Sequence, residues 1–468
     1  MAQNKKDTVR EIVSAYSSYH FNPINTNLFR HADLMEAIEF FEENQELEVA
    51  SLGCSEEGRE IKTITYGRGK TKVLLWSQMH GNESTATRAI LDLLVFFTSS
   101  DAFNSLRKQL ADSLTLVFIP MLNPDGAERF QRRTSTEIDM NRDAIALQTP
   151  EARLLKNTAE QFKPDFAFNL HDQRRFYNVG NTGVPSSLSF LAPAFDQSRK
   201  VNKVREKAMQ VIAGINEYAQ EYIPGGVGLY DDAYSHRSFG DFMQSKGIST
   251  ILVESGWIKD DPEKEAIRKL NFASLLKGFE LIASAALNQF SVKDYSDIPS
   301  IDTKLFDVLI KNAGFTGSVS PVLDIGINRT EQLLDHPHYF SIGKIDDLGD
   351  LSSFFGFETI DATQLKVAPG KAVRLSDYSE LSTVSVKRLL RQGVLFLITE
   401  QVPLESHVAY PVNIIHPRKL PYLQHPVFEG SANFLLVDQS KTIKYIVMNG
   451  FVFEPDKINE SANGLVIS

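Results

Sequence analysis

The sequence of 468 residues contains one cysteine, Cys54, which excludes an intrachain disulfide and a zinc site built on several cysteines. It has no run of about 18 apolar residues that would suit a membrane-spanning helix, and the longest candidate, 89–97, contains Asp92. Positive charge is not in excess, because 49 basic and 59 acidic residues leave a net charge of −10, whereas nucleic-acid binding needs a basic surface. The first residues carry charges where a signal peptide has an apolar core. We therefore expect a soluble, cytoplasmic protein that binds neither membranes nor nucleic acid.

The composition and length indicate a globular protein of two or three domains. Hydrophobic residues make up 42% and charged residues 23%, as in ordinary soluble proteins, and one domain usually takes roughly 150 residues. From about residue 48 to 290, short β-branched runs alternate with longer helical patterns, which predicts an α/β sheet with helices on both faces. The predicted strands are 72–78, 114–121, 165–170 and 249–253, and the predicted helices are 84–97, one that begins at Thr149-Pro150, 196–222 and 261–288.

The pattern changes after about residue 289, where helical periodicity becomes scarce. Short apolar runs are then separated by Gly, Pro, Asn and Asp, which is typical of a small all-β unit. These runs are 322–327, 394–399, 434–437 and 443–447. We therefore predict a larger domain over 1–290 and a smaller, non-catalytic β-sandwich over 300–468.

Polar side chains follow four predicted strands of the larger domain. His80 and Glu83 follow the first strand, 123–126 (NPDG) follows the second, His171 follows the third and Glu254 the fourth. The carboxyl ends of strands in an open α/β sheet meet at one edge, where ligands bind. Catalytic zinc takes three protein ligands from His, Glu or Asp. We therefore predict a zinc site there, with Glu254 free to take a proton from a metal-activated water.

The other histidines that we considered do not end apolar strands at this edge. We interpret them as surface or packing residues: His20, His31, His336, His338, His407, His416 and His425. Taken alone, Glu83 would also suit a helix N-terminus. The prediction of a metal site depends on the combination of residues, not on any single one.

A group of arginines lies close in sequence to the predicted ligands. Arginine binds a carboxylate through two parallel hydrogen bonds, so the group favours an anionic substrate, with a solvated loop as the alternative for each residue alone. Its members are Arg129, Arg132, Arg133, Arg142, Arg174 and Arg175.

These residues occur in motifs that resemble the zinc carboxypeptidases, the group of carboxypeptidases A, B and E with their bacterial members. The motifs are HGNE at 80–83, NPDG at 123–126, RRTSTEIDMNRD at 132–143, and the strands that end in His171 and Glu254. The resemblance covers roughly residues 10–290 and implies a mixed central sheet with helices on both faces. It also implies one zinc ion per chain, held by His80, Glu83 and His171.

The resemblance further implies the roles of the remaining motif residues. Glu254 is expected to act as general base and then acid, and Arg132 to stabilise the oxyanion of the tetrahedral state. Asn141 and Arg142 match the pair that holds the C-terminal carboxylate of the substrate. Asp143 departs from the family, where asparagine often follows this pair.

The loop 225–242 corresponds to the part of the family that carries a mobile tyrosine. It offers Tyr230 and Tyr234, and we expect Tyr234 to contact substrate. The same loop contains acidic residues that either favour a basic substrate side chain or are simply solvated. These residues are Asp231, Asp232 and Asp241.

The C-terminal domain shows a different likeness. The segments 324–329, 358–370 and 430–454 resemble the composite β-sandwich of amidohydrolases. The metal-binding histidine pair that follows the APG turn in those enzymes is absent after residue 370. Three roles are therefore open for the domain: to cover the active site, to support a homo-oligomer, or to be structural.

Together, these patterns predict a zinc metallocarboxypeptidase that hydrolyses the C-terminal peptide bond of a peptide with a free carboxylate. One alternative is a zinc-dependent deacylase of N-acyl amino acids, similar to aspartoacylase and succinylglutamate desuccinylase. Another is a peptidase that recycles cell-wall peptides. A third, from a different class, is a peptide-binding protein without catalysis, which the intact set of ligands and Glu254 disfavours.

Overall fold

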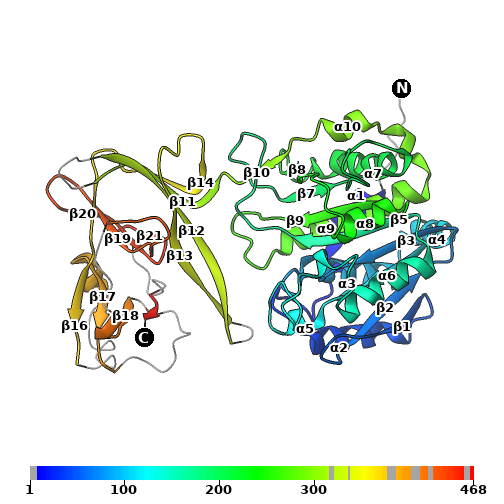
Figure 1. Cartoon of the computed structure of the whole chain (residues 1–468), viewed down its shortest axis with the longest axis horizontal. Coiled ribbons are helices and arrows are strands. Elements are labelled where there is room, and N and C mark those ends of the chain that lie inside the picture. The colour runs from blue at the N-terminus through cyan, green and yellow to red at the C-terminus, as the bar shows by residue number, and fades with distance from the viewer. Residues whose placement is uncertain are drawn as a thin grey trace. The chain divides into compact units, whose positions relative to one another are not determined.

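In a computed structural model of the chain, the described residues are 8–315, 321–335, 338–376, 386–401, 410, 412–419, 425–457 and 464–467. The chain forms two compact units, Met1–Thr303 and Lys304–Ser468 (Figure 1). The division follows the segment 290–300 that separates the two predicted domains, whose roles stay predictions. His336 and His407 lie outside the described residues, as does the side chain of His338.

An eight-stranded sheet forms the centre of the N-terminal unit, and its parallel middle explains the long apolar runs of the sequence. Parallel pairing joins β4, β3, β5 and β9, and antiparallel pairing joins β1 to β2, β2 to β4, and β7 to β9. The prediction of a mixed sheet is therefore confirmed. The order is β1 (Leu47–Cys54), β2 (Glu60–Tyr66), β4 (Leu114–Ile119), β3 (Thr71–Trp76), β5 (Phe166–Asp172), β9 (Ser249–Ser255), β7 (Leu188–Leu191) and β8 (Val227–Leu229).

Helices cover both faces of this sheet, as the strand–helix alternation predicts. Successive residues of β3 show why: Val73 and Leu75 pack on one side, and Leu74 and Trp76 on the other. The first side is covered by α3 (Thr85–Thr98), α7 (Lys203–Ala219) and α9 (Glu265–Ala283), and the second by α6 (Pro150–Phe162) and α8 (Phe239–Ser245). Further helices and strands of this unit are α1 (Thr8–Ser14), α2 (His31–Glu42), α4 (Asn104–Ser113), α5 (Pro124–Glu128), β6 (Asn178–Val179), α10 (Val292–Ser296) and β10 (Ile301–Asp302), with the 3₁₀ turns η1 (Tyr16–Ser18), η2 (Met140–Arg142) and η3 (Ala286–Gln289).

Two of these helices begin later or end earlier than the sequence predicts. The pattern predicts a helix over 196–222, but α7 starts at Lys203, because the side chain of Asn202 accepts hydrogen bonds from the backbone N–H groups of Val204 and Arg205. Helix α9 starts at Glu265 rather than at 261.

Inside the protein, Asp92 of α3 forms a fully buried ion pair with Arg268 of α9 at 2.6 Å. This pair explains the acidic residue within the apolar run 89–97.

The C-terminal unit contains two sheets. The larger has β13 (His338–Gly349), β12 (Val322–Asp335), β11 (Leu305–Gly314), β15 (Lys366–Ala368), β19 (Phe434–Val437), β20 (Ile443–Met448) and β21 (Phe451–Phe453), with β14 (Phe355–Asp361) paired to β11. The smaller has β16 (Lys371–Arg374), β17 (Val394–Ile398), β18 (Asn413–Ile415) and β22 (Val466–Ile467), all parallel. Leu435, Ile446 and Met448 of the larger sheet share a buried core with β17 and β18.

This unit is rich in strands, as the sequence predicts, but it is not all-β. The described residues include helix α11 (Val386–Arg391), which lies between the parallel strands β16 and β17, and the 3₁₀ turn η5 (Pro417–Lys419). A parallel pair needs a crossover and not a tight hairpin, which explains the helix. The likeness to the amidohydrolase β-sandwich stays a prediction.

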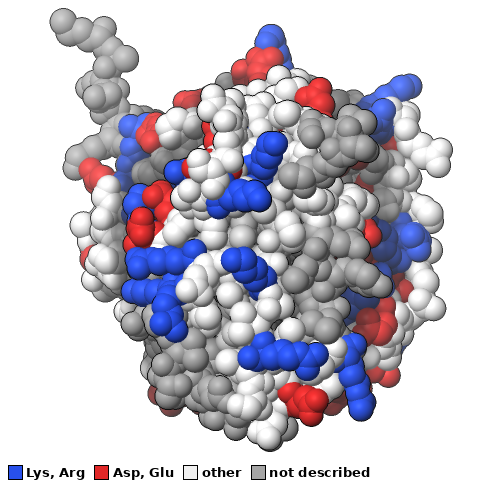
Figure 2. Space-filling model, turned by 90° about the vertical axis from the view of Figure 1, so that its left-hand side faces the viewer, with Lys and Arg blue, Asp and Glu red and all other residues white. Residues whose placement is uncertain are grey.

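Charge is unevenly distributed over the surface. Figure 2 shows a face on which basic side chains are more prominent than acidic ones, although the chain has a net charge of −10. The expectation that nucleic acid does not bind rested on that net charge, and it stays a prediction. Among the described residues, no helix is both long enough and apolar enough to cross a lipid bilayer.

Candidate metal centre

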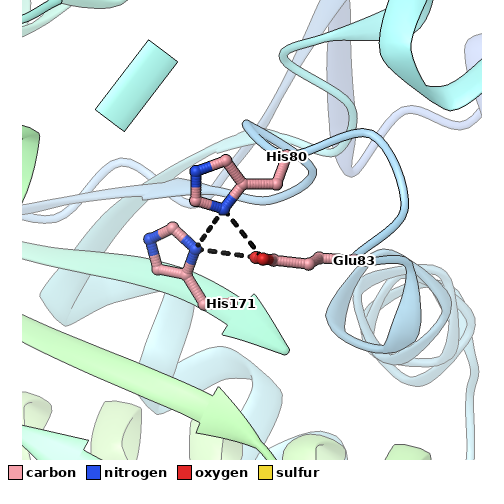
Figure 3. A group of neighbouring side chains, drawn as sticks. All are labelled: His80, Glu83 and His171. Carbon is pink, nitrogen blue, oxygen red and sulfur yellow. Dashed lines mark hydrogen bonds and ion pairs between the residues drawn. The ribbon is translucent and has the colours of Figure 1, made fainter. Parts of the chain in front are cut away.

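Three side chains from two separate segments meet at the carboxyl ends of β3 and β5. His80 and Glu83 come from the loop between β3 and α3, and His171 comes from β5 (Figure 3). Oε1 of Glu83 lies 2.8 Å from Nδ1 of His80, and Oε2 lies 2.8 Å from Nδ1 of His171. The two Nδ1 atoms are 3.2 Å apart. All three residues are buried, and two imidazoles with one carboxylate are a donor set that fits catalytic zinc.

A sharp change of backbone direction after β3 presents these residues. Gln78 has a positive φ of 45°, and the backbone N–H of Glu83 donates to the carbonyl of His80 at 3.1 Å, which closes a turn. Gly81 is required in this turn because a Cβ atom there would lie 2.0 Å from the carbonyl carbon of Gly126. The loop that carries His80 and Glu83 therefore packs directly on the NPDG segment.

The NPDG segment joins the metal loop to the loop of Arg132. The side-chain amide of Asn123 donates to the carbonyls of Met79 at 3.3 Å and Arg132 at 3.5 Å, while its oxygen accepts from the N–H of Gly126. Asp125 is fully buried and accepts hydrogen bonds from Ser55 Oγ and the guanidinium of Arg59, each at 2.7 Å. The NPDG motif therefore has a structural role, because it holds the two loops together.

Asp139, which the sequence analysis did not single out, contacts the candidate metal centre. Its Oδ1 lies 3.1 Å from Nε2 of His80, and its Oδ2 accepts from Arg132 at 3.1 Å. Burial raises the pKa of Asp139, but the hydrogen bond to His80 and the charges of His80 and Arg132 hold it well below its usual range. A carboxylate that accepts from a ligating histidine orients the ring. Its position two residues before Asn141 was the available signal.

Arg132 lies beside the predicted ligands. Its guanidinium donates to Oε1 of Glu83 at 3.1 Å as well as to Asp139, and its side chain is 45% exposed. The structure therefore places a fixed positive charge at the solvent side of the cluster. This placement is compatible with a role in stabilising negative charge on a substrate.

Glu254 lies on β9 directly opposite His171 on β5 in the parallel register. It is buried, with 8% of its surface exposed. Burial, followed by the negative charges of Glu83 and Asp172, raises the pKa of Glu254 well above its ordinary value, whereas Arg132 and Lys264 oppose the shift. A carboxyl group that is destabilised in its charged form and lies next to a metal centre is suited to accept a proton.

Asn141 and Arg142 lie in the turn η2, between the metal centre and α8. Nδ2 of Asn141 lies 3.4 Å from Nε2 of His171, and its Oδ1 accepts from the N–H of Phe239 at 2.9 Å. The exposed guanidinium of Arg142 donates to the carbonyl of Asn141 at 2.6 Å and to Ser238 Oγ at 3.0 Å. Among the described residues Arg142 forms no ion pair, so it offers donors to an incoming carboxylate.

The loop after β8 carries Tyr230, whose surroundings include Tyr177 and the charge of Glu254. Its hydroxyl lies 3.4 Å from that of Tyr177, and its pKa is raised by burial and then by the charge of Glu254. Tyr234 forms no hydrogen bond with any residue that the structure describes. The expectation that Tyr234 contacts substrate stays a prediction, and Tyr230 is the second candidate in this loop.

The acidic residues of this loop have different surroundings. Asp232 pairs with Arg199 and Arg205, each at 3.0 Å, so its charge is already neutralised. Asp231 is exposed and accepts from the N–H of Ala233. Asp241 is 8% exposed, and burial raises its pKa to about 6.

The remaining arginines of the basic group do not all converge on the site. Arg129 forms an ion pair with Glu57, and Arg133 donates to the carbonyl of Glu137. Arg175 stacks on the rings of Phe176 and Trp257, and Arg174 is exposed.

Comparison with known proteins identifies the N-terminal part of the chain. Residues 35–179 match the family described as zinc carboxypeptidase, Peptidase_M14. This stretch of the chain is therefore similar to zinc carboxypeptidases. The matched range includes His80, Glu83, Arg132, Asn141, Arg142 and His171, whereas Glu254 lies beyond it.

Two relatives with similar sequences are fungal proteins. A probable carboxypeptidase 2 of Trichophyton verrucosum is 26% identical over 215 residues, which are 43% of this chain and 39% of that protein. Carboxypeptidase 2 of Trichophyton tonsurans is 27% identical over 168 residues, 34% of this chain and 30% of that protein. The chain therefore spans less than half the length of these relatives.

The chain is also similar, at low sequence identity, to solved structures. A metallo-carboxypeptidase from Burkholderia cenocepacia is 16% identical, with 55% of this chain and 70% of that chain covered, at a TM-score of 0.45. Carboxypeptidase A from Helicoverpa armigera is 16% identical, with 60% and 80% covered, at a TM-score of 0.42.

Proposed function

We propose that the protein is a zinc-dependent metallocarboxypeptidase that removes the C-terminal residue of a peptide. The observation that carries this proposal is the cluster of His80, Glu83 and His171 with Glu254 opposite His171 in the sheet. Zinc held by the three clustered residues would supply Lewis-acid chemistry at a carbonyl group and at water.

Residues of the chain carry out proton transfer, stabilisation of negative charge and binding of the substrate carboxylate. Glu254, with its raised pKa, takes a proton from the attacking water and delivers it to the leaving amine. Arg132, fixed by Glu83 and Asp139, stabilises the negative charge that develops on the carbonyl oxygen. Arg142 and Asn141 hold the free carboxylate of the substrate, and this contact restricts cleavage to the last peptide bond.

The proposed substrate has a free carboxylate next to the amide bond that is cleaved. A free carboxylate next to the scissile amide is common to peptides and to N-acyl amino acids, so both belong in the test. Tyr230 is the tyrosine that we propose for contact with substrate, because its hydroxyl lies 3.4 Å from that of Tyr177 and the charge of Glu254 acts on it. A cytoplasmic location and a homo-oligomeric state remain predictions.

Hydrolysis of a dipeptide series, of N-acyl amino acids and of carboxyl-amidated peptides, each with and without a metal chelator, tests this function. We expect chelator-sensitive release of the C-terminal amino acid from peptides with a free carboxylate. Preferential hydrolysis of N-acyl amino acids would instead indicate the deacylase. Hydrolysis of neither class by protein that carries one zinc per chain would refute the proposal.

A further inference from the structure

A single ammonium group lies between the ends of the two strands that carry His171 and Glu254. One residue beyond His171, β5 ends at Asp172, and one residue beyond Glu254, β9 ends at Ser255. These last residues are partners in the parallel register. Nζ of Lys264 donates to Oδ2 of Asp172 at 3.0 Å and to the carbonyl oxygen of Ser255 at 3.5 Å.

Asp172 is in turn connected to the predicted ligand Glu83. The backbone N–H of Asp172 donates to Oε2 of Glu83 at 3.2 Å. Thr85, two residues after Glu83 and the first residue of α3, donates its hydroxyl to Oδ2 of Asp172 at 2.5 Å. The other oxygen of Asp172, Oδ1, is buried and has no hydrogen-bond partner among the described residues. The contact with Lys264 therefore ends a chain of bonds that begins at Glu83.

Several carboxylates lie near the cluster, so the positive charge of Lys264 beside Asp172 matters for the stability of the site. The carboxylates of Glu83, Asp139, Asp172 and Glu254 lie close to the cluster, and Arg132 pairs only with Glu83 and Asp139 among them. Lys264 is the cation that pairs with Asp172, and its side chain is only 14% exposed. A buried carboxylate that loses its cation is strongly destabilised. Without Lys264, Asp172 would have to move toward water, and its N–H would move away from Glu83.

The backbone of Lys264 is held in place. Lys264 precedes α9 with φ 53° and ψ 34°, a left-handed conformation that residues with a side chain rarely adopt. Its neighbours are anchored elsewhere: Glu263 accepts from the N–H of Asn27 at 2.9 Å, and Glu265 pairs with Arg88 at 2.7 Å. A conformation of this kind persists only where the surroundings enforce it. The fixed backbone therefore restricts the position of the Lys264 ammonium group.

We propose that Lys264 is a positioning residue of the metal centre, which fixes the end of β5 to the end of β9 and, through Asp172, orients Glu83. The proposal rests on the proposed function for its catalytic consequence, but its effect on metal binding does not depend on the substrate. Among the described residues, Lys264 donates to Asp172 and Ser255 and to none of His80, Glu83 and His171.

Zinc affinity measured by competition with a chelator tests the proposal, with Lys264→Met, Lys264→Arg and the control Lys277→Met. Lys277 is a matched control because it lies on α9 and pairs with Glu280 at 2.7 Å, with 17% of its side chain exposed. We expect Lys264→Met to raise the zinc dissociation constant about tenfold, as loss of a group that orients a ligand does. Lys264→Arg should stay within about threefold of the unchanged protein, because a guanidinium also spans two acceptors.

The direction of the change in the zinc dissociation constant distinguishes a positioning role of Lys264 from a purely electrostatic effect of its charge. Removal of a nearby cation strengthens the attraction of the site for Zn²⁺ if nothing moves. An unchanged or smaller dissociation constant for Lys264→Met would therefore overturn the proposal, and so would an equal loss in Lys277→Met.

Activity gives a second measurement, and a double variant guards against misfolding. Lys264→Met should lower kcat about tenfold or more with KM within about threefold, because the site is displaced and the carboxylate-binding pair is intact. Asp172→Asn combined with Lys264→Met leaves no unpaired carboxylate, so it should fold and recover at least half of the lost zinc affinity on a logarithmic scale. No recovery in a folded double variant would contradict the role of Asp172. If the unchanged protein binds zinc but cleaves no peptide, the proposed function fails, and the zinc affinities still decide the role of Lys264.

Discussion

His171 and Glu254 occupy the same register position on the adjacent parallel strands β5 and β9. Neighbouring strands lie about 4.8 Å apart, and paired residues direct their side chains to the same face. A predicted metal ligand and the predicted base are therefore held at a fixed spacing by the backbone hydrogen bonds of the sheet. The spacing does not depend on a mobile loop.

Glu254→Gln should abolish most of the activity without loss of metal. We expect kcat to fall about 10²- to 10⁴-fold, the usual contribution of a general base, while zinc stoichiometry stays at that of the unchanged protein. Steady-state kinetics and metal analysis of the same preparation measure both quantities. Glu280→Gln on α9 is the control, since Glu280 pairs with Lys277 away from the site. A Glu254→Gln variant with the original kcat would show that another group accepts the proton.

Arg142→Ala should affect substrates according to their C-terminal group. Hydrogen bonds to a charged partner contribute about 1.5–3 kcal/mol, so KM for peptides with a free carboxylate should rise about 10- to 100-fold. KM for hydrolysis of carboxyl-amidated peptides should change little. Arg153→Ala is the control, because the side chain of exposed Arg153 donates to the carbonyls of Leu147 and Gln148 and to no other group in the described part of the chain. Equal changes for both kinds of substrate would remove the proposed role of Arg142.

Tyr230→Phe and Tyr234→Phe compare the two tyrosines of the loop directly. The charge of Glu254 acts on Tyr230, so loss of the Tyr230 hydroxyl should lower kcat/KM about 5- to 10-fold, as expected for one hydrogen bond of about 1 kcal/mol. Tyr234→Phe should leave kcat/KM unchanged. The reverse result would restore the expectation from the sequence that Tyr234 contacts the substrate.

Asp241 should make the folded state less stable as pH rises. Burial raises the pKa of Asp241 from its model-compound value of 3.8 to about 6. The folded state therefore binds more protons than the unfolded state between these values, and stability falls from about pH 4 to pH 6. Asp241→Asn should raise the free energy of unfolding by about 1–3 kcal/mol above pH 7, and should not raise it near pH 4. Denaturant unfolding at the two pH values measures the difference, and a gain that is independent of pH would contradict this explanation.

Local patterns in the sequence determined the strands, the residues at their ends and the chemistry that those residues support. Apolar runs in β3, β5 and β9 are long because helices cover both faces of the sheet, and this pattern is readable without coordinates. His80, Glu83, His171 and Glu254 follow such runs directly. Their meeting at one edge follows from the geometry of parallel strands.

The tertiary structure alone decided which groups surround that edge. Asp139 reaches His80, Lys264 reaches Asp172 across 92 residues, and the charge of Glu254 acts on Tyr230. It also decided that the C-terminal unit contains a parallel second sheet with helix α11. Such contacts depend on strand register, on the path of loops and on the burial of charge. These are properties of the whole folded chain, and short stretches of sequence do not encode them separately.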